Sequence, residues 1–260
     1  MKKIFLTVFV AAFSILSFAQ NTKSIVYDAN AEVRKVAEFK AVDVSSAIAV
    51  YLSQGTETAV AISVENGDKE KVKTEVKNGV LKIFVESSFW GKWGDNKIKA
   101  YVTIKDVEKL VASGASQIRI ADKIIATNLK VTCNGASTIK GEIKAEELKF
   151  DLTGASSSNL TINTNTLNVD ISGASSGNFN GSANALNIDA SGASNFKGFD
   201  LIANTCTADA SGASTIRVNV TKEFSKIHAS GASSIHYKGD ATIKNFESSG
   251  ASSIKKDSGK

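Results

Sequence analysis

Residues 168–176, "NVDISGASS", contain the feature that decides the fold. Their Gly-Ala-Ser triplet occurs eight times, beginning at Gly114, Gly135, Gly154, Gly173, Gly192, Gly212, Gly231 and Gly250. Successive glycines are separated by 21, 19, 19, 19, 20, 19 and 19 residues. Such a period is typical of solenoids, in which each repeat stacks on the next. At roughly 3.3 Å per extended residue, one repeat is long enough for a coil of a β-helix with two or three flat sides.

Alignment of the repeats on the glycine separates inward from outward positions. Four residues before it a mostly apolar column runs from Leu110 to Phe246, and two residues before it a second column runs from Ala112 to Ser248. Another apolar column, mostly Ile and Phe, stands four residues after the glycine. Because polar residues alternate with all three, we expect a strand on each side of every triplet, with these columns in the core.

The triplet itself is predicted to form a bend. Glycine permits backbone conformations that other residues resist, and alanine leaves room for neighbouring coils. Unbroken alternation would point the serines into the corner, where their hydroxyl groups can bond to the adjacent coil or to backbone groups. A directly functional serine array is the alternative. Cys133 and Cys206 occupy different inward columns four coils apart, about 19 Å at 4.8 Å per coil, so we expect two free core thiols.

The chain before the first triplet is β-rich but less regular. Alternating stretches such as "FKAVDVSSAIAVYLSQG" and "KVKTEVKNGVLKIFVESS" predict strands, and hairpins are expected at Asn66-Gly67-Asp68 and Asn78-Gly79. We therefore divide the chain into residues 20–110, a β-rich N-terminal part continuous with the solenoid, and residues 111–260, a regular β-helix with Gly-Ala-Ser repeats.

Residues 1–19 have the pattern of a secretory signal peptide. Lys2 and Lys3 precede an apolar run that ends at small residues beside Phe18. A membrane anchor is the rival interpretation, and no later segment is apolar enough to span a bilayer. Cleavage would lower the formal charge from +5 to 5 − 2 = +3, which is too thinly spread to indicate nucleic-acid binding. We expect an exported protein of the periplasm, the cell surface or the extracellular space.

Several stretches together resemble a known family. The opening "FKAVDVSSAIAVYLSQG", the hairpin "VKNGVLKIFVE", the strand "IKAYVTI" leading into "VEKLVASGAS" and the recurring "SGAS" coils are similar to the putative auto-transporter adhesin, head GIN domain family of exported bacterial proteins. The resemblance implies a right-handed parallel β-helix, similar in shape to pectin lyases but without an assigned catalytic set. It also implies a role in cell adhesion, and it supplies no functional residue.

A column of acidic residues lies three places before the glycine. It contains Asp151, Asp170, Asp189 and Asp209, with Glu247 two coils later. Alternation points these side chains outward at about 4.8 Å spacing, where like charges repel. Bound Ca²⁺ would relieve the repulsion, but the glycine-rich nonapeptide of calcium-binding solenoids is missing, and solvent with nearby lysines is the favoured explanation. His228 and His236 fall outward on opposite sides of one bend, which is too few ligands for a zinc site.

The segment "SSFWGKWGDN" departs from the repeat and contains both tryptophans. Phe89, Trp90 and Trp93 there would either plug the end of the solenoid or, if exposed, contact sugar rings or a protein. The sequence predicts a non-enzymatic adhesion or binding protein whose stacked polar side chains contact a polysaccharide or a cell-surface protein. A β-helical polysaccharide lyase or hydrolase, using the aspartates as acid and base, and a structural envelope protein are the alternatives.

Overall fold

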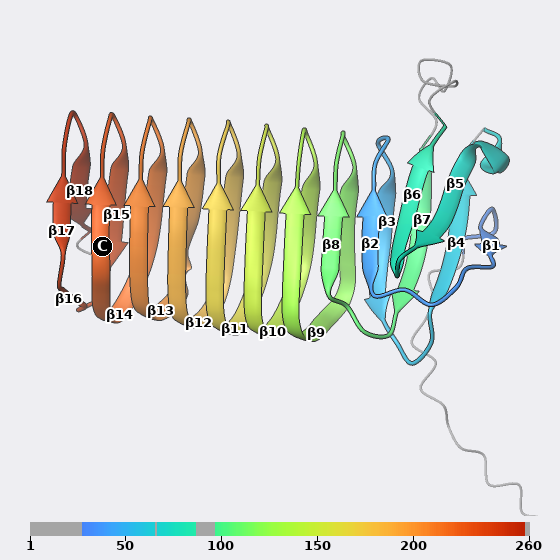
Figure 1. The fold of residues 1–260 in the computed structure, drawn as a ribbon, viewed down its shortest axis with the longest axis horizontal. Helices are drawn as coiled ribbons and strands as arrows, with labels where there is room; N and C mark the ends of the chain where they lie inside the picture. Colours follow the sequence, from blue (N-terminus) through green and yellow to red (C-terminus); the bar gives the residue numbers. More distant parts are fainter. Residues whose placement is uncertain (1–27, 66, 87–96, 258–260) are drawn as a thin grey trace, which may run out of the picture.

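The structure, a computed structural model, describes residues 28–65, 67–86 and 97–257. Strands dominate this part of the chain and join into one sheet, which winds into a right-handed solenoid (Figure 1). The predicted all-β, parallel β-helical fold is confirmed. The predicted signal peptide, residues 1–19, lies outside the described residues.

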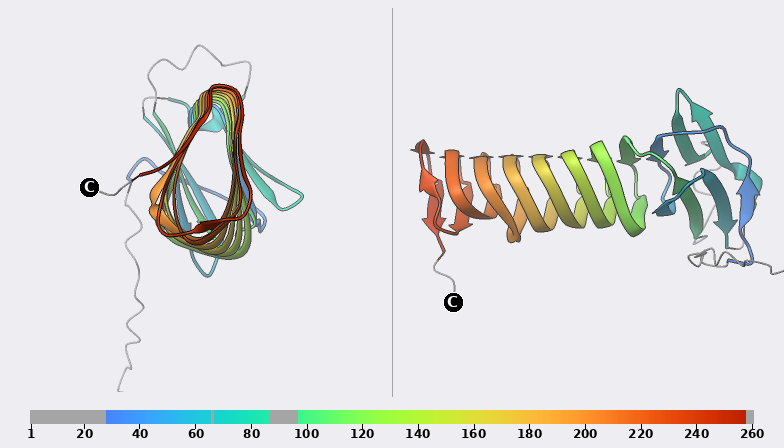
Figure 2. Two further views of the ribbon diagram at one scale, coloured as in Figure 1. Left: turned by 90° about the vertical axis from the view of Figure 1, so that its left-hand side faces the viewer. Right: turned by 90° about the horizontal axis from the view of Figure 1, so that it is seen from below.

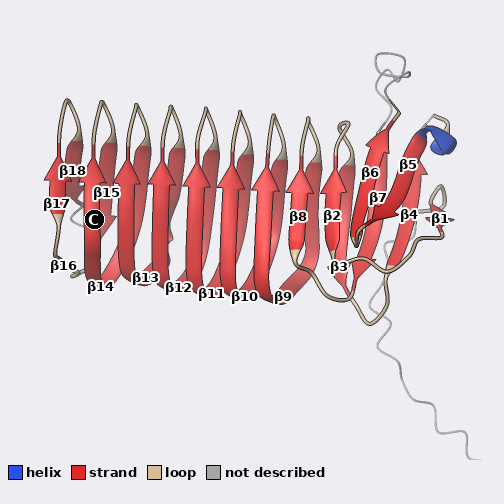
Figure 3. Ribbon diagram, in the orientation of Figure 1, coloured by secondary structure: helices blue, strands red, loops and turns tan. Residues whose placement is uncertain are grey.

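Six long strands each run from one triplet to the next and form the regular coils (Figure 3). They are β9 (Gln117–Cys133), β10 (Thr138–Leu152), β11 (Ser157–Ile171), β12 (Ser176–Ala190), β13 (Asn195–Ala210) and β14 (Thr215–Ala229). Each pairs in parallel with the next, and equivalent residues of adjacent coils lie opposite one another. The last coil is divided into β15 (Ser234–Lys238), β16 (Thr242–Ile243), β17 (Phe246–Ser248) and β18 (Ser253–Lys256). Seen along the axis, the coils enclose a roughly triangular core (Figure 2).

The predicted inward columns form this core along nearly the whole solenoid. Leu110, Val131, Ile188 and their equivalents up to Ile227 are buried, as is the column from Ala112 to Ala229. The prediction was wrong at the last coil, where Phe246 is 55% exposed and Ser248 is also exposed. No later coil of the described chain covers them, so the alternation there points the side chains inward without burying them.

Small residues interrupt the apolar column that follows the triplets, at Ser158 and Gly177. A Cβ at Gly177 would lie 2.4 Å from the ring of Phe179. That ring packs edge-on against Phe150, with centroids 5.5 Å apart, and stacks on Phe196 at 5.1 Å. The missing side chain at Gly177 therefore makes room for a ring from the next inward position of the same strand.

The Gly-Ala-Ser bend carries the sheet ladder around the corner. All eight triplet glycines have positive φ, between 68° and 77°. In each of the later coils the alanine N–H donates to the glycine carbonyl of the coil before it, as from Ala174 to Gly154 at 2.7 Å. Stacking is so close that a Cβ at Gly173 would lie 2.5 Å from that carbonyl oxygen. The alanines are exposed, so the close contact between neighbouring coils is at the glycine and not at the alanine.

The serine of each triplet points inward, as predicted, and all but that of the last coil are buried. Their hydroxyl groups mostly donate to carbonyls near the bend of the preceding coil, as from Ser137 to Ala112 at 3.0 Å and from Ser214 to Ala190 at 3.0 Å. Ser116 of the first triplet is the exception among the described bends, with a buried hydroxyl that has no hydrogen-bond partner. The serines therefore satisfy backbone acceptors inside the corner.

The N-terminal strands continue both main ladders of the solenoid. The strands β2 (Ala41–Val44) and β3 (Ala49–Gln54) form a coil that pairs in parallel with β8 (Lys109–Ala112) and β9. Its other side pairs with β6 (Val80–Val85) and β7 (Ile98–Ile104). In this coil Ser46 stands at the glycine position and takes the same left-handed conformation, with φ 68°. The connection from β7 to β8 crosses beneath the coil (Figure 1).

Antiparallel strands complete the N-terminal end. They are β1 (Glu32–Arg34), β4 (Ala59–Val64) and β5 (Val72–Lys77). The hairpin predicted at Asn78-Gly79 joins β5 to β6. The one predicted at Asn66-Gly67-Asp68 is wrong, because β4 pairs with β1 and β7 while Asp68 caps a 3₁₀ turn, Lys69–Lys71, by accepting from the N–H of Glu70. Residue 66 lies outside the described residues.

Candidate functional site

The aspartates of the predicted acidic column stand in register on one side of the solenoid. Asp151 pairs with Asp170, Asp170 with Asp189, and Asp189 with Asp209, so the predicted ladder is present. The column continues through His228 to Glu247. These residues lie next to the last residue of their strands, just before the Gly-Ala-Ser bends.

Basic side chains from the neighbouring column neutralise both ends of the aspartate run. The Lys130 ammonium lies 2.8 Å from Asp151, and Lys149 lies 3.4 Å from Asp170 and 4.0 Å from Asp151. At the other end, Asp209 contacts Lys226 at 3.2 Å and the Nδ1 of His228 at 2.9 Å. These contacts agree with the favoured explanation of relief by nearby lysines.

Asp189 lies in the middle of the run and has no ion-pair partner among the described residues. Burial raises its pKa, and the charges of Asp209 and Asp170 raise it further. For Asp209, burial opposes ionisation, but hydrogen bonds from His228 and Lys226 outweigh it and leave the pKa lowered. The described chain contains no group of three acidic, histidine or cysteine side chains arranged to hold a metal ion. Calcium on this column remains a prediction without a supporting geometry.

Amides and hydroxyl groups also stack in register on the outer surface. Asn168 and Asn187 share a hydrogen bond of 2.8 Å, and Asn165 and Asn184 one of 3.0 Å. Two half-buried columns, mostly serine and threonine, flank the bends. They are Ser113, Asn134, Thr153, Ser172, Ser191, Ser211 and Ser230 on one side, and Gln117, Thr138, Ser157, Ser176, Asn195, Thr215, Ser234 and Ser253 on the other.

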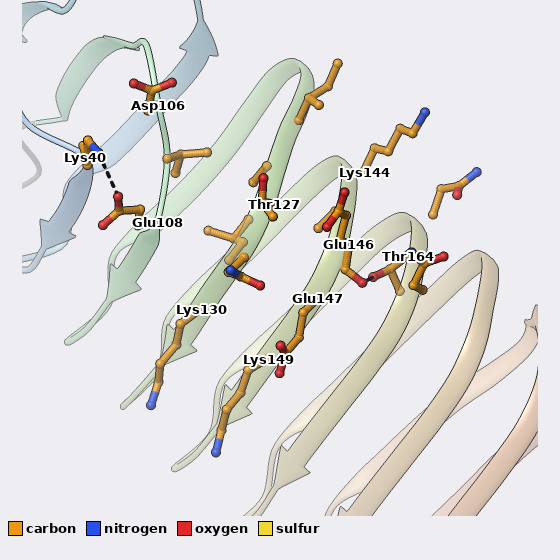
Figure 4. Close-up of a pocket in the computed structure, with 18 residues that line it drawn as sticks. Lys40, Asp106, Glu108, Thr127, Lys130, Lys144, Glu146, Glu147, Lys149 and Thr164 are labelled. Atoms are coloured by element: carbon orange, nitrogen blue, oxygen red, sulfur yellow. Dashed lines mark hydrogen bonds and ion pairs between the residues drawn. The ribbon is translucent and has the colours of Figure 1, made fainter.

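A mixed-charge hollow of about 1050 Å³ lies where the β7–β8 connection meets the lower corner of the coils (Figure 4). Lys40 and Glu108 form an ion pair of 3.0 Å at its edge, and this hydrogen bond raises the pKa of Lys40. Lys130 and Lys149 extend from successive coils in the same direction (Figure 4). Acids and lysines alternate around the hollow, so it has no dominant charge.

Other predicted residues are placed as follows. His228 and His236 lie on opposite sides of one bend, and the latter contacts Asp257 at 3.2 Å. Cys133 and Cys206 are free and buried, as predicted, and burial raises the pKa of the Cys133 thiol to about 12. The predicted contact residues Phe89, Trp90 and Trp93 lie outside the described residues.

Sequence reasoning missed an outward column on the opposite side of the bend. Five residues after each glycine, basic side chains and amides follow one another in register. This basic column comprises Arg119, Lys140, Asn159, Asn178, Lys197, Arg217, His236 and Lys255. The alignment that revealed the aspartates would have revealed it too.

A family model matches most of the chain. A family model described as "Putative auto-transporter adhesin, head GIN domain" matches residues 38–241. No curated protein matches the sequence. No helix in the described chain is long and apolar enough to cross a bilayer.

Three similar solved structures share the fold at low sequence identity. A protein from Parabacteroides distasonis described as a putative lipid binding protein is 20% identical, with a TM-score of 0.70, over 87% of this chain and 97% of that one. A putative adhesin from Bacteroides fragilis is 20% identical, with a TM-score of 0.64, over 87% and 95%. A putative adhesin from Parabacteroides merdae is 16% identical, with a TM-score of 0.74, over 88% and 95%.

Proposed function

Because this chain belongs to the head GIN domain adhesin family, we propose that it is an exported, non-enzymatic protein that binds polysaccharide through its repeated outer columns. Export is supported by the signal-peptide pattern of residues 1–19. The partner class is supported by the chemistry of the outer surface.

The observation that carries the proposal is the register of outward polar side chains. Each coil presents the same kinds of group as the coil before it, so hydroxyl groups and amides recur at about 4.8 Å along the axis. Ser172, Ser191 and Ser230 make no side-chain hydrogen bond to another described residue, which leaves their hydroxyl groups free to bond to solvent or a ligand. A polymer of repeating hydroxyl-rich units would meet the same groups coil after coil.

Multivalent contact is the mechanism that suits such a surface. Contacts to single exposed hydroxyl groups are weak, but each unit already bound raises the effective concentration of the next. Affinity should therefore rise with the length of the polymer. Glycan fragments spanning one or two coils would bind poorly, while long chains would bind well.

An adhesin and a polysaccharide-degrading enzyme would change the mass of the polymer in opposite directions. We would follow polymer mass by light scattering after mixing the protein, without its predicted signal peptide, with a panel of neutral and acidic polysaccharides. The expected result is an increase in mass without chain shortening, unchanged when EDTA replaces Ca²⁺. A steady decrease in mass would refute the non-enzymatic proposal, and no change with any polysaccharide would refute the partner class.

The same measurement on protein variants compares two candidate contact regions. Trp90→Ala tests the predicted aromatic contact, whereas Asp170→Ala with Asp189→Ala tests the acidic column. If binding is carried by the regular columns, Trp90→Ala should leave the mass increase unchanged. Loss of binding in that variant alone would assign the contact to the segment around Trp90.

A further inference from the structure

The basic column differs in charge balance from the acidic column on the other side of the bend. Arg119, Lys140, Lys197 and Arg217 form no ion pair with any described residue, and neither does Lys255. Arg119 instead lies 5.6 Å from the ring centroid of Tyr51 and donates to Gln117. On the acidic side, by contrast, Lys130, Lys149 and Lys226 are each paired with an aspartate.

Because adjacent coils are in register, these side chains lie in one line along the solenoid axis. Arg119 pairs with Lys140, Lys197 with Arg217, and Lys255 with His236, so these side chains occupy the same position in adjacent coils. In the two central coils Asn159 and Asn178 take their places and are joined by a hydrogen bond of 3.0 Å. Acidic residues on this side stand further along the strands. Glu142 is paired with Lys123, and Asp200 lines a hollow with Lys197 and Arg217 without forming an ion pair.

Groups that suit a sugar adjoin the cations. The hydroxyl-rich column from Gln117 to Ser253 lies two residues before them on the same side, at about 7 Å along the strand. At the N-terminal end of the column, Tyr51 stands in register with Arg119 and stacks on Tyr101, with ring centroids 5.3 Å apart. Most coils therefore offer a positive charge or an amide beside a hydroxyl group or a second amide, and aromatic rings continue the line.

Resting on the proposed function, we propose that this basic column is the binding site for an acidic polysaccharide that carries a carboxylate on its sugar units, and that the polymer lies along the solenoid axis. A uronic acid polymer presents one carboxylate and several hydroxyl groups per sugar unit, which suits a column that offers a cation or an amide in most coils beside a second column of hydroxyl groups and amides. Duplex DNA fits less well, because its phosphates recur every 3.4 Å or so on each strand and wind away from a straight column.

The test compares two fourfold variants with the same change in net charge. The basic-column variant carries Arg119→Gln, Lys140→Gln, Lys197→Gln and Arg217→Gln. The control carries Lys109→Gln, Lys130→Gln, Lys149→Gln and Lys226→Gln on the acidic side. Titration calorimetry measures the affinity for polygalacturonate, for uncharged dextran and for double-stranded DNA. Thermal melting followed by circular dichroism checks that both variants are folded.

We expect the basic-column variant to bind polygalacturonate about tenfold or more weakly, because four exposed ionic contacts are removed together. The control should change affinity by less than about threefold, and Lys140→Arg with Lys197→Arg should retain binding. Binding by the unaltered protein should weaken strongly at about 1 M salt, where the Debye length is only about 3 Å.

Several results would overturn this inference. Equal loss in both variants would show that net charge alone matters. Binding of polygalacturonate that the basic-column variant leaves intact, or binding of dextran without polygalacturonate, would move the contact elsewhere while leaving the proposed function standing. Tighter binding of DNA with the same sensitivity would assign the column to nucleic acid. Absence of binding to both polysaccharides would count against the proposed function as well.

Discussion

Replacing Gly173 with alanine tests whether close stacking of coils explains the glycine in every triplet. Gly173 has φ +73°, a conformation that costs a residue with a Cβ about 1–2 kcal/mol. Its new Cβ would also lie 2.5 Å from the carbonyl oxygen of Gly154, a backbone atom that is held in the ladder by a hydrogen bond. Overpacking of this kind typically costs about 1–3 kcal/mol. We therefore expect Gly173→Ala to lower the free energy of unfolding by about 2–5 kcal/mol.

Two other glycines separate the conformational cost from the steric one. Gly114 has φ +68° but its Cβ would meet only the backbone nitrogen of Ser46, at 3.5 Å, and Gly79 has φ +73° with nothing within 4 Å. Alanine at either position should cost about 1–2 kcal/mol. Replacing glycine by alanine also lowers the conformational entropy of the unfolded chain, but this effect is the same in all three variants and cancels when they are compared. Urea denaturation followed by circular dichroism gives the three values, and an equal loss at Gly114 and Gly173 would refute the stacking explanation.

Three further predictions concern single side chains. Ser214→Ala should lower stability by about 0.5–1.5 kcal/mol in urea titrations because it removes a buried hydrogen bond, whereas Ser116→Ala, which removes an unpartnered buried hydroxyl, should be neutral or stabilising. Asp189→Asn should stabilise the protein at neutral pH by about 0.2–1 kcal/mol, because it removes a carboxylate that is repelled by Asp170 and Asp209. The folded-state pKa of Asp189 is raised, so this gain in stability should vanish as the pH falls through that pKa and the aspartate becomes neutral. A gain that persists at pH 3 would contradict the charge explanation. Cys133 should resist a thiol reagent at pH 8 in the folded protein and react after denaturation, since burial raises its pKa to about 12.

The regular part of the fold was predictable because one residue type, glycine, is required at one point of every coil. That requirement sets the register, and the register decides which columns face inward. The free cysteines and the inward serines follow from it. Ser46 shows where this signal fails, since it occupies the glycine position of the first coil without being a glycine. An alignment based on the Gly-Ala-Ser triplet therefore misses the coil formed by β2 and β3.

Other errors have physical causes that the sequence pattern does not contain. Asn66-Gly67-Asp68 suits a tight turn, but β4 finds its partners in β1 and β7, so long-range pairing overrides the local signal. Phe246 alternates as a core residue, yet its burial depends on a further coil. The aspartate column was predicted in full, whereas the basic column was overlooked because lysine, arginine, asparagine and histidine share its positions and no single residue type fills most of them.

The fold does not determine which polar residue types occupy the outer columns. An outward position on a solenoid side accepts most polar residues, because neither packing nor the backbone ladder constrains its side chain. The residues five places after the glycine could therefore have alternated in sign, which would have neutralised the column as lysines neutralise the aspartates. Instead, eight successive coils place no acidic residue there, and five carry a lysine or an arginine. Cations stacked at about 4.8 Å repel one another and cost stability, so their accumulation on one column indicates a negatively charged partner that offsets the repulsion when it binds.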